Sequence, residues 1–109
     1  MALAVVIGWS EAEQAIAERA FNTAYGRAIA TLISTVRSQA DSISSAESLW
    51  QLHDYLSTQR HVIEGRFDMR LDGILFVFAN LLKEDLIQLD ELSGLDAEKI
   101  SKIKAMSRF

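Results

Sequence analysis

The chain has 109 residues, of which 50% are hydrophobic and 24% charged, with no cysteine and a formal net charge of -4. These values fit one globular domain and exclude disulfides and cysteine-based metal sites. They also argue against nucleic acid as the main partner, because phosphate contacts need a basic face.

The chain opens with MALAVVIG, which is apolar but contains no lysine or arginine. It is far shorter than the roughly 20 residues that a membrane span needs. We therefore expect neither a signal peptide nor an integral membrane segment, and we expect a cytoplasmic protein. No pattern assigns this segment a role.

Helix is predicted throughout, because the chain contains no proline, only five glycines and no sustained alternation of polar and apolar residues. Ser10 and Glu13 form a capping box, which predicts a first helix from Glu11 to about Ala40. Its apolar stripe contains Phe21, Tyr25, Ile29, Leu32, Ile33 and Val36.

The first predicted helix is long for so small a chain. About 30 residues span about 45 Å, whereas a compact chain of this length has a radius of gyration of about 13 Å. Because such a helix projects beyond its own domain, we expect a stalk that forms a homodimer. The alternative is a kink near Gly26 and a compact monomer.

A second helix is predicted over 45–64, opened by a capping box of Ser44 and Glu47 and ended or bent at Gly65. Its two sides differ in chemistry. One side carries an apolar stripe, which consists of Leu49, Leu52, Leu56 and Ile63. The opposite side carries Trp50, Asp54, Ser57 and His61, with His53 and Arg60 on its flank.

Tryptophan and arginine are favoured anchors at protein interfaces, so the Trp50 side is a candidate docking surface. The alternative is that Trp50 packs on the C-terminal helices of its own chain. Composition and spacing alone support these two interpretations equally.

The remaining elements predict a small C-terminal head. A strongly apolar helix is expected over 71–82, a short helix over 85–92, a turn at Gly94 and a last helix from Asp96 to about Met106. Phe67, Phe76 and Phe78 are expected in the core, with one exposed member. The fold prediction is therefore one all-α domain, 1–109, with two stalk helices (about 9–64) and a helical head (about 66–109).

Nothing in the sequence indicates catalysis or a bound metal or cofactor. His53 and Asp54 are adjacent and point about 100° apart on a helix, while Asp54 and His61 are two turns apart. Nucleophile elbows, phosphate-binding glycine loops and HExxH spacing are missing. We expect no enzyme and no cofactor; a small helical enzyme or metal protein is the weaker alternative.

Three segments carry a resemblance to a known family: LWQLHDYLSTQRHVIEGRFDMR at 49–70, LFVFANLLKE at 75–84 and DAEKISKIKAM at 96–106. From about Trp9 to the C-terminus, the chain resembles the cyanobacterial fluorescence recovery proteins. Two departures are the N-terminal MALAVVIG and Asp85, where glycine is expected.

The resemblance implies a non-enzymatic regulator of photoprotection without a chromophore. Such proteins bind the photoactivated red form of the orange carotenoid protein. They accelerate its reversion to the orange form and its release from the phycobilisome, which ends quenching. The resemblance also implies a homodimer, at the cytoplasmic face of the thylakoid membrane. A helical dimeric adaptor for a different protein partner is the alternative.

The resemblance further assigns roles to residues. The partner-binding patch maps onto Trp50, His53, Asp54 and Arg60, and a contact of the head maps onto Phe76 and Lys102. Leu49 matches a position at the family's dimer interface, to which we also assign Leu52 and Leu56 on the same stripe.

Overall fold

The computed structural model, which describes residues 8–109, contains four α-helices and one short 3-10 helix. They are α1 (Glu11–Asp41), α2 (Ala46–Arg66), α3 (Ile74–Lys83), η1 (Leu89–Leu92) and α4 (Ala97–Ser107). The described residues contain no strand, so the all-α prediction is confirmed. The expectations for MALAVVIG fall largely on residues 1–7, outside the described part of the chain.

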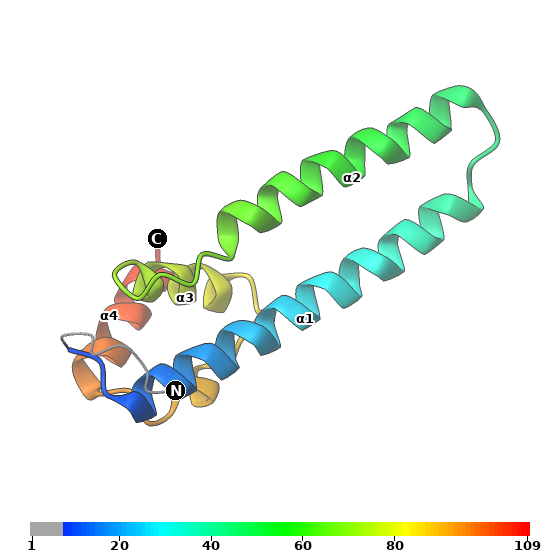
Figure 1. Cartoon of the computed structure of the whole chain (residues 1–109). Coiled ribbons are helices and arrows are strands. Elements are labelled where there is room, and N and C mark those ends of the chain that lie inside the picture. The colour runs from blue at the N-terminus through cyan, green and yellow to red at the C-terminus, as the bar shows by residue number, and fades with distance from the viewer. Residues whose placement is uncertain (1–7) are drawn as a thin grey trace.

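The first helix is one continuous element of 31 residues. The predicted capping box is present, because the Ser10 hydroxyl accepts from the Glu13 N–H and the Glu13 carboxylate accepts from the Ser10 N–H. Figure 1 shows α1 and α2 running side by side, away from the end that holds α3 and α4. The radius of gyration is 17.1 Å, above the value of about 13 Å for a compact chain, so the kinked compact alternative is wrong.

The second helix starts one residue later than predicted. Its capping box uses Ser45 and Ser48 instead of Ser44 and Glu47, because the Ser48 hydroxyl accepts from the Ser45 N–H at 3.1 Å. Gly65 does not end the helix, which continues to Arg66.

Beyond α2, Phe67 packs edge-on against α1. Its ring centroid lies 5.4 Å from that of Phe21 and 5.2 Å from that of Tyr25. Residues 67–73 form a loop, so α3 begins at Ile74 rather than at Leu71. The Phe67 ring therefore holds the C-terminal end of α2 against α1.

The apolar core lies between the start of α1 and the head. It contains Ala17, Ala20, Ala24, Ile74, Val77, Phe78, Ala79, Leu81, Ile87, Leu92, Leu95 and Ile103. Of the three phenylalanines expected in the core, Phe78 is buried, Phe67 is half-buried and Phe76 is exposed. The expectation of one exposed member is confirmed.

The predicted helix over 85–92 is wrong, apart from the 3-10 turn at its end. Asp85 has a φ of 59°, a left-handed conformation that interrupts a right-handed helix. The N–H of Leu86 bonds to the carbonyl of Leu81 at 2.9 Å, and that of Asp85 to Leu82 at 3.1 Å. This bond pair is the Schellman motif, which ends helices with a left-handed residue.

Candidate functional site

The second helix presents its side chains to solvent. Within Ala46–Arg66 no residue is buried in the single chain. Trp50 is 60% exposed, and Leu49 and Leu56 are 45% and 42% exposed. The alternative in which Trp50 packs on its own head is therefore wrong, and the ring is free to contact another molecule.

The Trp50 ring has two polar neighbours along the helix. The His53 ring lies edge-on to it, with centroids 6.1 Å apart. The His53 Nδ1 atom lies 3.3 Å from Asp54 Oδ1, although adjacent helical residues were expected to diverge. Both side chains are exposed, and such surface contacts contribute little to stability. His53 and Asp54 thus place exposed polar groups next to the apolar Trp50 ring.

Arg60 lies further along α2 and pairs with a different carboxylate. Its Nε donates to Glu64 Oε1 at 2.9 Å, an i,i+4 contact between two exposed side chains. We call the four partner-binding residues of α2 (Trp50, His53, Asp54 and Arg60) the stalk patch. The structure links the first three side chains and places Arg60 in a separate ion pair.

A mostly apolar groove of about 610 Å³ lies between α1 and α2. It is lined by Tyr25, Ile29, Leu32, His53, Leu56, Ser57, Arg60, Ile63 and Glu64. His53 and Arg60 therefore share one groove with Leu56 of the apolar stripe. The sequence predicted His53 and Arg60 on the flank of the Trp50 side. In the structure they lie between that side and the apolar stripe of α2, which includes Leu56.

The head residues assigned to partner binding are both exposed. Phe76 projects from α3 with 62% of its surface accessible, and Lys102 lies on α4 with its Nζ 3.2 Å from Glu98 Oε1. An exposed phenylalanine on a helix whose other large apolar side chains face the core suits a contact with another protein.

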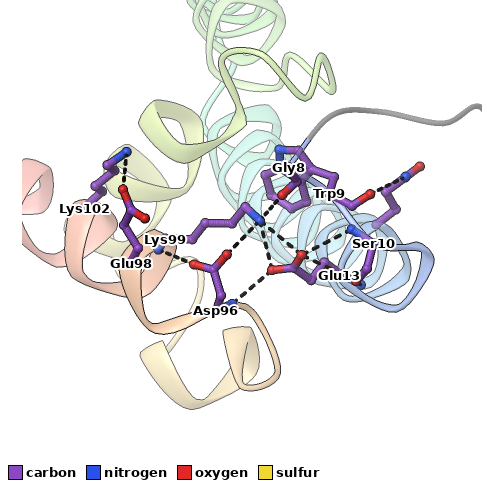
Figure 2. A network of polar contacts seen from close by, with 9 residues as sticks. Gly8, Trp9, Ser10, Glu13, Asp96, Glu98, Lys99 and Lys102 are labelled. Atoms are coloured by element: carbon purple, nitrogen blue, oxygen red, sulfur yellow. Dashed lines mark hydrogen bonds and ion pairs between the residues drawn. The ribbon is translucent and has the colours of Figure 1, made fainter.

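A polar cluster around the buried Lys99, missed by the sequence analysis, joins the start of α1 to the start of α4 (Figure 2). It consists of Gly8, Trp9, Glu13, Asp96 and Lys99. The Lys99 Nζ donates to the Gly8 carbonyl and pairs with Glu13 at 3.0 Å and with Asp96 at 3.2 Å. It also lies 4.5 Å from the centre of the Trp9 ring, within the range of a cation–π contact.

Hydrogen bonds shift the pKa values of this cluster. The pKa of Glu13 is lowered, mainly because its carboxylate accepts from the Asp96 N–H at 3.0 Å, with Lys99 adding to the effect. Burial alone lowers the pKa of Lys99, but its bonds to Glu13 and Asp96 outweigh burial and raise it. All three groups are thus held in their charged forms. A visible sequence signal was Asp96, whose expected role as cap of α4 is confirmed.

Within residues 8–109, three or more potential metal ligands nowhere come together. The same residues include no helix with the length and apolarity required to cross a bilayer.

Known proteins resemble this chain along most of its length. Residues 9–107 match the family described as photoprotection regulator fluorescence recovery protein. The fluorescence recovery protein of Synechocystis sp. PCC 6803 is 50% identical over 100 residues, which cover 92% of each chain.

Solved structures agree with this match. The fluorescence recovery proteins of Fremyella diplosiphon and Synechocystis sp. PCC 6803 each superpose with a TM-score of 0.89. Their sequence identities are 46% and 50%, and each comparison covers 93% of this chain and 99% of the other. The chain therefore belongs to the fluorescence recovery protein family of photoprotection regulators.

Proposed function

We propose that this protein binds the photoactivated red form of the orange carotenoid protein without acting as an enzyme. It accelerates reversion to the orange form and release from the phycobilisome, and so ends photoprotective quenching. It acts in the cytoplasm, at the cytoplasmic face of the thylakoid membrane. The observation that supports this proposal is the exposed Trp50 ring on a helix with no buried residue, in a chain of this family.

The proposed active form is a homodimer. Most of the stability of a helix in a protein comes from tertiary packing, and α2 has no buried residue within its own chain. Covering the exposed Leu49 and Leu56, together with the half-buried Leu52, would supply the missing apolar contacts. A second copy of the chain offers the same stripe, as a two-fold interface requires.

The proposed mechanism is differential binding. A protein that binds two states equally shifts neither, and acceleration requires preference for the transition state of reversion. We propose that the dimer holds the separated domains of the carotenoid protein close together, which raises their effective concentration. Trp50 supplies apolar contact area, while Asp54 and Arg60 supply charges that orient the partner.

The test is dark recovery of the red carotenoid protein, followed by visible absorbance with and without this chain. Trp50→Ala should slow recovery and leave the dimer intact. A central tryptophan contributes about 2 kcal/mol or more to binding, so affinity should fall about thirtyfold. Leu49→Glu should instead yield monomers, because it places a charge in the apolar interface.

The chromatographic mass of both variants serves as the control for the two roles. Equal loss of the dimer in both would contradict the separation of partner-binding and dimer residues. If the wild-type dimer leaves recovery unchanged, the carotenoid protein is the wrong partner, and the alternative of an adaptor for another protein stands.

A further inference from the structure

One face of α1 carries small residues bracketed by two charges. At successive spacings of four, three, four and three, this face contains Glu13, Ala17, Ala20, Ala24 and Arg27. The three alanines are buried in the core shared with the head. Each terminal charge makes an ion pair with a residue of the head: Glu13 with Lys99, and Arg27 with Glu91.

An alanine stripe permits close packing but specifies position weakly. Helix packing is fixed by side chains of one element that enter grooves of the other, and an alanine offers only a methyl group. Ile16 and Phe21 of α1 also pack against this core, so the apolar contact opposes sliding of the head along α1 in part. Directional hydrogen bonds at both ends of the alanine stripe would supply the remaining resistance.

The Lys99 end is the buried one. The Lys99 side chain is 11% exposed and the Glu13 side chain 12%, so water has little access to this ion pair. The Asp96 N–H also donates to Glu13 at 3.0 Å. One α1 carboxylate thus fixes both the side chain and the backbone at the start of α4.

The Arg27 end is a two-pronged contact. The guanidinium donates to both carboxylate oxygens of Glu91, at 2.7 and 2.9 Å, and to the carbonyl of Leu86 at 2.9 Å. The same carboxylate accepts from the Gln88 N–H at 2.7 Å. Forked Arg–carboxylate bonds have a defined geometry, so this end fixes residues 86–91 against α1.

We infer that these two ion pairs lock the register of the head along α1, and thereby set the distance between the head contact and the stalk patch. Lys102 lies one turn beyond Lys99 on α4. The stalk patch lies on α2, whose C-terminal end is held to α1 by the Phe67 ring against Phe21 and Tyr25. Lys99 and Arg27 are positioning residues in this view. The functional part rests on the proposed function, because binding through two surfaces requires that their separation match the partner.

The register is tested by distance measurements between spin labels. Because the chain has no cysteine, Ser34→Cys on α1 and Ser101→Cys on α4, both exposed, provide unique label sites. An excess of unlabelled chain isolates the distances within one protomer. Lys99→Met should broaden or shift the distance distribution, whereas Lys99→Arg, which keeps the charge, should retain it.

Lys104→Met is the matched control, since Lys104 is an exposed lysine of the same helix, and its distribution should equal that of the wild type. If Lys99→Met leaves the distance distribution between the two labels unchanged, the inference that the ion pairs fix the position of the head along α1 is wrong. If Lys99→Met does not fold, Arg27→Met tests the more exposed end, and an unchanged distribution there has the same meaning.

The functional part is tested by recovery kinetics with the same variants. Lys99→Met should reduce the acceleration at least about tenfold, because the gain from two linked contacts is lost, while its dimer mass stays unchanged. A broadened distribution with full acceleration would overturn the positioning role. If the wild type does not accelerate recovery of the red carotenoid protein, the proposed function is wrong. The spin-label distances would still decide whether the two ion pairs fix the position of the head along α1.

Discussion

Asp85 occupies a backbone position that favours glycine. Its φ of 59° lies in the left-handed region, which a Cβ atom makes costly and which aspartate tolerates better than most residues. The sequence analysis marked this position only because relatives were expected to carry glycine. The structure supplies the reason, since the Schellman bonds of Leu86 and Asp85 require the left-handed turn.

We expect Asp85→Gly to stabilise the protein by about 1 kcal/mol and Asp85→Ala to destabilise it, because alanine has a Cβ but no polar group to bond locally. Urea unfolding at equal protein concentration measures both. Equal stability of the alanine and glycine variants would show that the left-handed conformation carries no cost here.

Glu13 links the capping of α1 to the stability of the whole head. Its pKa is lowered in the folded chain, so the folded state binds a proton less readily than the unfolded state does. This group therefore stabilises the fold at pH values above its unfolded pKa of about 4.3. That contribution is lost as the pH falls through the lower folded value.

Glu13→Gln should destabilise the protein by about 2 kcal/mol near neutral pH, because the buried Lys99 loses one of its two carboxylate partners and keeps only Asp96. The difference from the wild type should narrow below about pH 4. Urea unfolding across a pH series checks this, with Glu11→Gln, an exposed residue of the same helical turn, as the control. A difference that stays constant with pH would contradict the role of the Glu13 charge.

At the scale of elements, α2 and α3 differ in what holds them. Five of the ten residues of α3 are buried, whereas none of the 21 residues of α2 is. Helices with few buried contacts open locally at low free-energy cost. In the proposed dimer, α2 would gain its protection from the second copy.

Hydrogen exchange should separate these two sources of stability. In a monomeric Leu49→Glu variant, we expect the amides of residues 50–62 to exchange much faster than in the wild type, because nothing covers them. The amides of residues 77–83 should change little and serve as the internal reference. Equal acceleration in both helices would show that the head also depends on assembly.

Local signals made some elements predictable from the sequence. The start of α1 and the start of α4 follow from Ser10 and Asp96, whose side chains bond within one turn. The start of α3 and the helix predicted over 85–92 were wrong, because a loop through Phe67 and a left-handed residue interrupt the apolar pattern.

The candidate site was predictable to the same degree. Trp50 stood out because it lies opposite the apolar stripe of its helix, whereas the pattern placed Phe76 in the core and only the family resemblance assigned it a contact. The structure exposes both rings. The Lys99 cluster was not predictable, because Glu13 and Lys99 are 86 residues apart and only the folded chain joins them. The alanine face of α1 escaped notice because alanine contributes little to an apolar pattern.

At the scale of the whole molecule, the single chain is elongated, with extents of 54 × 35 × 19 Å. One end contains the core and the other consists of α1 and α2 (Figure 1), with no buried residue in α2. If a second copy covers the stalk, association and folding are linked, and stability depends on protein concentration.

We expect the thermal midpoint to rise with protein concentration for the wild type, because mass action favours the folded dimer. The Leu49→Glu variant should show a lower midpoint that does not depend on concentration. A midpoint independent of concentration in the wild type, over the range where light scattering shows dissociation, would contradict coupling between assembly and stability.

The exposed second helix also bears on the lifetime of the protein in a cell. Proteases cut segments that open locally, at rates that follow the population of the open form. An unpaired protomer, whose α2 has no buried residue, would be degraded sooner than an assembled one. Turnover would then remove surplus single chains and keep the pool of regulator close to its assembled fraction, without any dedicated degradation signal.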